Sequence, residues 1–241
     1  MKHPGRPAVF TAAFKYSVPV LLGYLAIGVA FGLLLADAGY PWWLSPVMSV
    51  VMFAGAGQYI AVGLFAAGTS LWEACLVQLV VNARHMAYGL TMLKRFKKAG
   101  IYKYYLIFAL SDETFALLSS LPDEEAGPDR ERFMFSVALL DHCYWIAGSV
   151  IGAVAGSLIP FNMEGIGFAL TALFIVLMIE QILRVKRPGI FIISAGAAVL
   201  AVFLLPGRVS LLSAMTLSLA LAGLRFRLYR SRLRSGRTTL N

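Results

Sequence analysis

Residues 133–159 read FMFSVALLDHCYWIAGSVIGAVAGSLI, an apolar run long enough to cross a bilayer as one helix. Its first half contains a carboxylate and an imidazole, Asp141 and His142. Its second half contains glycines at four-residue intervals: Gly148, Gly152 and Gly156. Glycines at this spacing share one helix face and let a second helix approach closely. The stretch therefore predicts a transmembrane helix that packs tightly on a neighbour and carries Asp141 and His142 as candidates for a proton or ion pathway.

The remainder of the chain has the same character. Of its 241 residues 59% are hydrophobic and 14% charged, and the mean hydropathy is +0.77, which excludes a soluble globular domain. Further apolar stretches, without the alternation of barrel strands, cover residues 17–36, 45–67, 71–93, 104–121, 165–183, 188–205 and 210–224. We expect an all-α fold, a polytopic transmembrane helical bundle of about seven or eight apolar segments. It forms a single integral membrane transport domain over residues 1–241, with a basic N-terminal segment (1–16) and a basic C-terminal tail (225–241).

The net charge of +9 comes from basic residues at the edges of apolar stretches, at 94–103, 184–187 and 225–237. This is the positive-inside pattern of membrane proteins, whereas a nucleic-acid-binding protein gathers its charges on one folded face. The sequence contains no hydrolase, nucleotide-binding or dinucleotide fingerprint, and no metal-ligand spacing. We therefore expect a lipid bilayer as surroundings and no catalytic residue, metal, cofactor or nucleic-acid partner.

The orientation of the spans does not follow directly from these charges. Three apolar stretches separate the basic N-terminus from residues 94–103, and three more separate these from residues 184–187. If all three basic regions face the cytoplasm, three complete crossings between them are impossible. Either one stretch in each triplet is re-entrant or broken, or two triplets insert in opposite orientations as an inverted repeat. Residues 121–132 are rich in acidic side chains, and we expect them on the non-cytoplasmic face.

Glycines and a polar amide interrupt the second apolar stretch at Gly55, Gly57 and Gln58. Such an interruption at mid-depth is typical of a discontinuous helix, whose exposed backbone groups can bind a carboxylate or an ammonium group. The alternative is a tight helix crossing. We assign these three residues to substrate binding.

A polar stripe runs along the third apolar stretch, where Gln78, Asn82, His85 and Gly89 recur at helical spacing. A polar stripe in lipid must face protein or water, so Asn82 is a candidate substrate ligand and His85 a candidate proton carrier. The alternative is that both only join helices. Arg84 points away from the stripe and needs an acidic partner or an interfacial position.

The fourth stretch carries Asp112 and Glu113 between Ser111 and Thr114. Consecutive polar residues surround most of a helix, which is costly at mid-membrane unless the helix is broken or opens on a wet vestibule. Either carboxylate could be the counter-ion of Arg84. The alternative is that the segment lies at an interface and the acids are hydrated.

Four motifs occur in a characteristic order: FAGAGQY at 53–59, NARHMAY at 82–88, SDETFA at 111–116 and DHCYW at 141–145. With them the chain resembles the AzlC-like large subunits of branched-chain amino acid exporters, from Phe14 to the last spans. The resemblance implies a multi-pass protein of the prokaryotic plasma (inner) membrane. It also implies export of valine, leucine or isoleucine, with methionine as a further candidate, together with a small AzlD-like membrane subunit.

An exporter without a nucleotide site must draw on an ion gradient, and protons are the expected coupling ion. Our hypothesis is that the break at residues 55–58 binds the amino acid, and that His85 with Asp112 or Glu113 carries the proton. A channel, a transporter of another small solute and an integral membrane enzyme are the competing interpretations.

Overall fold

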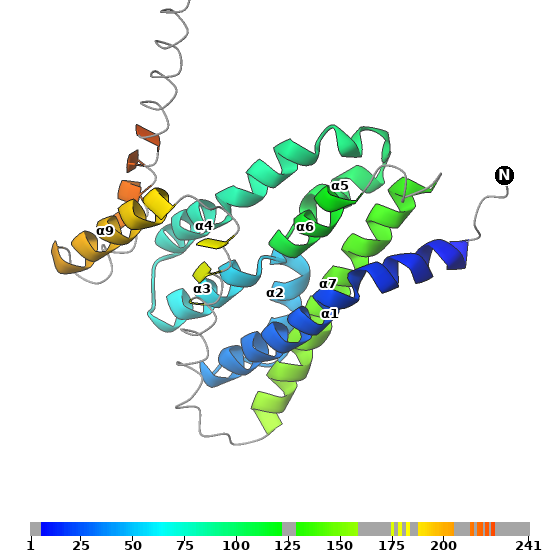
Figure 1. The fold of residues 1–241 in the computed structure, drawn as a ribbon. Helices are drawn as coiled ribbons and strands as arrows, with labels where there is room; N and C mark the ends of the chain where they lie inside the picture. Colours follow the sequence, from blue (N-terminus) through cyan, green and yellow to red (C-terminus); the bar gives the residue numbers. More distant parts are fainter. Residues whose placement is uncertain are drawn as a thin grey trace, which may run out of the picture. The chain divides into compact units, whose positions relative to one another are not determined.

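The computed structural model describes residues 6–121, 129–158 and 188–204 without interruption, and also residues 175, 178, 179, 182, 183, 213, 214, 216–218, 220, 221, 223 and 224. All regular structure in these residues is helical, which confirms the expected all-α class (Figure 1). The chain falls into two compact units, Met1–Leu170 and Thr171–Asn241.

Two long helices form the centre of the first unit: α1 (Arg6–Asp37) and α7 (Arg130–Leu158). They run side by side in the same direction. Near their starts the ring centroids of Tyr16 and Phe133 lie 5.6 Å apart, and further along Gly32 of α1 packs on Gly152 of α7. Because α1 and α7 are parallel, the chain between the end of α1 and the start of α7 must cross back once to the end at which α1 begins.

The helix α1 packs closely on Gly148, Gly152 and Gly156 of α7, called the glycine ladder here. A Cβ atom at Gly152 would collide with the backbone of Val29, and one at Gly32 would collide with the backbone of Ser149 and Ala153. The two helices therefore meet backbone to backbone, an approach that only glycine permits at these positions. The predicted packing role of the ladder is confirmed, with α1 as the neighbour.

The second apolar stretch forms two short helices, α2 (Leu44–Met52) and α3 (Gly55–Ala66), joined by a sharp turn. Phe53 in this turn has left-handed backbone angles (φ 35°). Gln58, one turn after the break, donates to Ser49 Oγ, one turn before it, at 3.2 Å. Because α3 runs back along α2, the stretch is a re-entrant hairpin (the first hairpin). The predicted discontinuity is confirmed, but it lies at Phe53 and Ala54, and residues 55–58, where it was expected, form the first turn of α3.

The first hairpin opens at the end of the unit where α1 terminates. The ring centroids of Phe65, near the end of α3, and Tyr40, just after α1, lie 6.0 Å apart. From there α4 (Leu71–Met92) starts at Ser70, whose side chain forms a capping box with Glu73. This helix returns to the other end of the unit, where the 3-10 helix η1 (Arg95–Lys98) follows.

The fourth apolar stretch is also a hairpin (the second hairpin), made of α5 (Tyr102–Phe108) and α6 (Asp112–Ser120). At the start of α5 the ring centroids of Tyr102 and Phe135 lie 4.7 Å apart, and at its end those of Phe108 and His142 lie 5.9 Å apart. The chain then turns back, since Leu117 in α6 accepts a hydrogen bond from Tyr16 near the start of α1. The two hairpins thus enter from opposite ends, and their tips meet against the middle of α7 (Figure 1).

This arrangement resolves the orientation problem for the first triplet. Of the described helices between α1 and α7 only α4 crosses completely, so the start of α1 and the basic residues 94–103 lie at the same end. The first alternative, re-entrant stretches, is the one that the structure adopts for residues 45–67 and 104–121.

The acidic residues 121–132 and the basic residues 94–103 cannot lie on opposite faces if the start of the acidic segment keeps its place in this structure. Arg95 in the basic turn donates to the carbonyl oxygens of Leu118 and Leu121, the latter at 2.9 Å. The start of the acidic segment therefore lies at the same end as the basic turn. Acidic side chains have little influence on orientation during insertion, so the basic residues prevail.

The surface of the first unit is apolar where it faces away from the centre. Leu22 on α1 is 68% exposed, and Leu79 and Leu90 on α4 are 60% and 71% exposed. Among the described helices, α1 and α7 meet the length and hydropathy expected of spanning helices, while α4 carries the polar stripe. An exposed apolar surface of this kind fits a hydrocarbon solvent.

In the second unit the structure describes one long helix, α9 (Pro188–Leu204), which corresponds to the stretch predicted at 188–205. The stretches predicted at 165–183 and 210–224 are described only at isolated positions. Residues 1–5 of the basic N-terminal segment, the basic turn 184–187 and the basic tail 225–241 lie outside the described residues.

Candidate functional site

The tips of both hairpins are fixed to one segment of α7, residues 141–145. Asp141 accepts a hydrogen bond from Thr114 in α6 at 2.8 Å, and Trp145 donates to Gln58 in α3 at 2.8 Å. Asp141 is fully buried and Trp145 is 2% exposed. The DHCYW motif is therefore the point that holds two broken helices together at mid-depth.

At the first hairpin a buried polar cluster closes the tip. Gln58 is fully buried; its Oε1 accepts from Trp145 and its Nε2 donates to Ser49 Oγ. Ser49 Oγ in turn lies 2.8 Å from Ser149 Oγ. Gly55 faces the indole of Trp145, where a Cβ atom would come within 3.3 Å of the ring. Gln58 thus holds the tip together, and its role in substrate binding stays a prediction.

At the second hairpin Ser111 caps α6, accepting from the backbone N–H of Thr114 at 3.1 Å. The Thr114 hydroxyl lies 2.9 Å from Ser111 Oγ and donates to Asp141. Tyr24 of α1 reaches the same group, at 2.5 Å from Ser111 Oγ and 2.8 Å from Glu113 Oε2. Glu113 and Asp141, separate in sequence, are therefore joined by hydroxyl groups.

His142 joins the first arms of the two hairpins. A carbonyl oxygen can only accept, so Nε2 carries a proton and donates to the Ser49 carbonyl at 3.0 Å. In the neutral ring Nδ1 then accepts from the Tyr105 hydroxyl of α5 at 2.9 Å. The imidazole also stacks on Phe53 with 4.2 Å between centroids. Both ring nitrogens are thus engaged in holding α2 and α5.

Arg84 finds the acidic partner that its position in α4 required. Its guanidinium lies 2.7 Å from Asp112 Oδ2, and the Tyr88 hydroxyl donates to Asp112 Oδ1 at 2.6 Å. Of the two candidate counter-ions the structure selects Asp112. Glu113 has no cation within ion-pair distance among the described residues.

The polar stripe of α4 meets the first hairpin at Gly57. Gln78 donates to the carbonyl oxygen of Gly57 at 2.8 Å, and Asn82 donates to Gln78 Oε1 at 2.9 Å. A Cβ atom at Gly57 would lie 2.9 Å from Gln78 Oε1 and 3.0 Å from Asn82 Nδ2. Asn82 Oδ1 is buried and has no hydrogen-bond partner among the residues that the structure describes. These three residues form a polar cluster, the Gly57 cluster, with a free acceptor.

His85 is not joined to either cluster by a hydrogen bond or ion pair in the part of the chain that the structure describes. Its ring lies 5.9 Å from that of Tyr88. Of the predicted proton carriers, Glu113 and Asp141 are linked through hydroxyl groups, whereas no hydrogen bond links His85 to either of them among the described residues.

Tyr24, Ser49 and Tyr105 were not singled out from the sequence, although each binds a predicted residue. A signal was present for Tyr24, because a phenol inside the apolar stretch 17–36 must find a hydrogen-bond partner when buried. Its partner lies 87 positions away in the chain, which no local pattern indicates.

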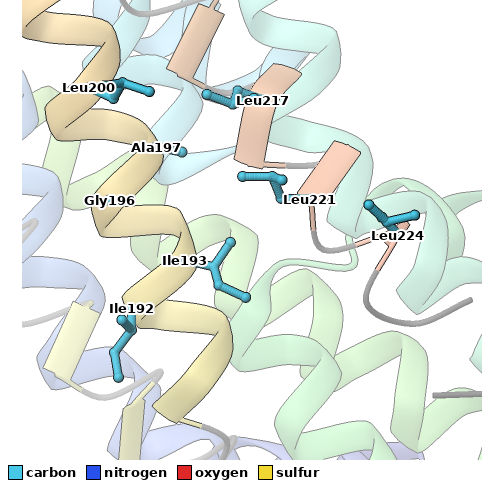
Figure 2. A pocket seen from close by; sticks show the side chains of 8 residues that line it. All are labelled: Ile192, Ile193, Gly196, Ala197, Leu200, Leu217, Leu221 and Leu224. Atoms are coloured by element: carbon cyan, nitrogen blue, oxygen red, sulfur yellow. The ribbon is translucent and has the colours of Figure 1, made fainter. Parts of the chain in front are cut away.

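An apolar pocket of about 780 Å³ occurs in the second unit, between α9 and Leu217, Leu221 and Leu224 (Figure 2). All of its lining side chains are apolar, so it offers no partner for a charged group. No group of three His, Cys, Asp or Glu side chains able to hold a metal ion occurs among the described residues.

The chain matches the family model described as AzlC protein over residues 19–159, the region that contains both hairpins and α7. It is 36% identical over 208 residues to the branched-chain amino acid transport protein AzlC of Bacillus subtilis (strain 168), covering 86% of this chain and 82% of the relative. It is 45% identical over 175 residues to an uncharacterized membrane protein of Helicobacter pylori (strain ATCC 700392 / 26695), covering 73% and 76%.

A third relative is the inner membrane protein YgaZ of Escherichia coli (strain K12), 30% identical over 185 residues, with 73% and 75% covered. No solved structure matches the chain. Because the family model covers more than half of the chain and the Bacillus relative is similar over most of both lengths, this membrane protein belongs to the AzlC family.

Proposed function

We propose that this chain exports branched-chain amino acids, namely valine, leucine and isoleucine, with methionine as a further substrate, across the prokaryotic plasma membrane. The proposal is a secondary-active, proton-coupled exporter that works with a small AzlD-like membrane subunit. It is supported by family membership and by the name of the Bacillus relative. The structural observation that carries it is an apolar pocket that adjoins the Gly57 cluster.

This pocket, of about 380 Å³, lies between the first hairpin and α4. Its walls are valine, methionine, leucine, alanine, phenylalanine and cysteine side chains, with Gln78 as the one amide. Met52 and Gln78 line the pocket and also contact Gly57. Its volume is in the range of small-molecule sites, roughly 300–1,000 Å³. An aliphatic side chain in this pocket would have its backbone groups at the Gly57 cluster.

The charged ends of an amino acid have complementary groups there. The first backbone N–H groups of α3, at residues 55–57, have no partner within the helix, and no acidic residue occupies its first turn. A helix N-terminus of this kind attracts a carboxylate. The buried, unpaired Oδ1 of Asn82 can accept from an ammonium group. We therefore assign substrate binding to Gly55, Gly57 and Asn82.

Proton coupling is assigned to Glu113 and Asp141. Asp112 is neutralised by Arg84, and His142 is engaged on both nitrogens. Carboxylates buried without a cation are typical of proton relays in transporters. The competing interpretations are a channel, which moves solute passively, and an integral membrane enzyme, which needs no gradient.

The test is efflux of preloaded radiolabelled leucine from cells that lack their own exporters. The chain is expressed alone, with the small subunit, and with the proton gradient collapsed. Acceleration that requires both subunits and the gradient supports the proposal. Acceleration that survives collapse of the gradient indicates a channel, and no acceleration despite confirmed membrane insertion removes leucine as the substrate.

A matched pair of variants locates the substrate. Asn82→Leu removes the free acceptor of the Gly57 cluster and should raise the KM for leucine by about tenfold, the cost of one hydrogen bond to a charged group. Thr91→Val on the same helix removes a hydroxyl that bonds only its own helix, to Ala87, and should leave the KM unchanged.

A further inference from the structure

Two carboxylates, Glu113 at the tip of the second hairpin and Asp141 in α7, are connected by a continuous row of three hydroxyl groups. The Tyr24 hydroxyl lies 2.8 Å from Glu113 Oε2 and 2.5 Å from Ser111 Oγ. Ser111 Oγ lies 2.9 Å from Thr114 Oγ1, which lies 2.8 Å from Asp141 Oδ2. Every link is within hydrogen-bond distance, and the row draws on α1, α6 and α7.

The row has four contacts and its hydroxyl groups supply three protons, so a fourth proton, on the carboxyl group at either end, completes the row. If Glu113 is protonated, each group donates toward Asp141, which is ionised. If Asp141 is protonated, each group donates toward Glu113. In either polarity all four contacts are hydrogen bonds, because a hydroxyl both donates and accepts. If both carboxylates were ionised, one contact would lack a proton.

The burial of the row suits transfer between an accessible and an inaccessible end. Thr114 and Asp141 are fully buried, and Tyr24 and Ser111 are 4% and 6% exposed. Glu113 is partly exposed. Asp141 Oδ1 has no partner in the described structure, so the carboxyl group can accept or release a proton without breaking another bond.

Other titratable or charged side chains interact electrostatically with the pair: Arg84 and Asp112 with Glu113, and Tyr105 and Tyr144 with Asp141. His142, next to Asp141 in α7, is instead bonded to Ser49 and Tyr105. Arg84 and Asp112 neutralise each other, and the Tyr144 hydroxyl lies 3.0 Å from Ser17 Oγ. The remaining net charge of the site is therefore that of Glu113 and Asp141.

We infer that Tyr24, Ser111 and Thr114 form a proton wire that carries one proton between Glu113 and Asp141. The Glu113 proton passes to the Tyr24 oxygen, that of Tyr24 to Ser111, that of Ser111 to Thr114 and that of Thr114 to Asp141. Four O–H bonds break and four form, and no charge is left on the hydroxyl groups. Glu113 ends as a carboxylate and Asp141 as a carboxylic acid.

The inference rests on the proposed leucine export, for which the wire would be the path of the coupled proton. Its test uses inside-out vesicles from cells that express the chain with the small subunit. One assay measures uptake of radiolabelled leucine driven by a pH gradient, which requires proton transfer. The other measures leucine–leucine exchange without a gradient, which requires only the substrate site.

Thr114→Val interrupts the wire and Thr114→Ser restores it. We expect Thr114→Val to lower gradient-driven uptake by about a hundredfold, the typical contribution of a positioned proton carrier, while exchange stays within about twofold. Thr114→Ser should retain both activities. Tyr24→Phe should behave like Thr114→Val, whereas Tyr16→Phe, which removes another α1 hydroxyl that binds α6, should not.

Gradient-driven uptake at the wild-type rate in Thr114→Val or Tyr24→Phe would overturn the wire. So would loss of exchange in parallel with uptake, because the hydroxyl groups would then serve the substrate path or the fold. Failure of the proposed function is distinct: the unaltered protein would then show neither exchange nor gradient-driven uptake, and the wire would fall with it.

Discussion

The guanidinium group of Arg84 in α4 and the carboxylate of Asp112 in α6 form an ion pair at 2.7 Å, with the two side chains 33% and 19% exposed. The pair joins a complete crossing to the tip of the second hairpin. Either charge alone would face an apolar surrounding without compensation, so the pair is needed as a unit.

A double-mutant cycle tests this relationship. Arg84→Gln or Asp112→Asn alone should lower the free energy of unfolding by about 1–3 kcal/mol, below the cost of a fully buried pair because both groups are partly solvated. The double variant should be more stable than the sum of the single effects predicts. Thermal unfolding in detergent measures the three variants. Strict additivity would show that the two side chains do not interact.

Arg132→Gln is the matched control, because Arg132 pairs with Asp129 at 3.5 Å on the surface. Loss of this ion pair should change the free energy of unfolding by no more than about 0.5 kcal/mol.

The glycine ladder predicts a steep steric response at one position. Gly152→Ala would place a Cβ atom against the backbone of Val29, which cannot move without separating α1 from α7. We expect a loss of about 1–3 kcal/mol of stability, or failure to accumulate as folded protein. Gly63→Ala in α3, where nothing lies within 4 Å of the new methyl group, should be tolerated. The ratio of folded to aggregated protein in size-exclusion chromatography measures both, and equal ratios would contradict the close approach.

Gly57→Ala is expected to damage transport more than stability. The three atoms nearest to the new methyl group would be ends of flexible side chains, Gln78 Oε1 at 2.9 Å, Asn82 Nδ2 at 3.0 Å and Met52 Cε at 3.0 Å. These can turn aside, but the Gly57 cluster is then rearranged. Leucine uptake should show a higher KM with an unchanged melting temperature. A lower melting temperature with an unchanged KM would mean that Gly57 serves only packing.

His142 is expected to couple the two hairpins mechanically. His142→Phe keeps a ring that can stack on Phe53 but leaves the Ser49 carbonyl and the Tyr105 hydroxyl without their partner. Each orphaned group costs about 1–3 kcal/mol. Hydrogen exchange followed by mass spectrometry should show faster exchange in both α2 and α5. Faster exchange in only one of them would contradict the coupling, and Tyr105→Phe, which removes one of the two bonds, should affect α5 more than α2.

The sequence predicted those features that follow from the cost of polar groups in lipid. Arg84 required an acid or an interfacial position, consecutive polar residues at 111–114 favoured a broken helix, a wet vestibule or an interfacial position, and the ladder at Gly148 and Gly152 predicted a close neighbour. Each is a local pattern with few physical solutions, and the structure contains one of these solutions for each pattern.

What the sequence did not determine is how the breaks turn. An interrupted helix can continue or reverse, and the choice depends on contacts distant in the chain. The first break occurs at Phe53 rather than at the neighbouring glycines, because its ring stacks on His142 and its strained left-handed backbone is held there. For the same reason the partner of Glu113 on α1, Tyr24, could not be found from spacing.

The central claim is that two re-entrant hairpins enter from opposite faces of the membrane and meet at α7. Single cysteines tested with a membrane-impermeant thiol reagent measure it directly, in a background in which Cys75 and Cys143 are replaced because both are free and exposed. Asp37→Cys and Ala66→Cys flank the first hairpin, and Lys98→Cys and Ser119→Cys flank the second. We expect Asp37→Cys and Ala66→Cys to react from one face, and Lys98→Cys and Ser119→Cys from the opposite face. Reaction of Asp37→Cys and Ala66→Cys from different faces would mean that residues 45–67 cross the membrane completely, and would contradict the central claim.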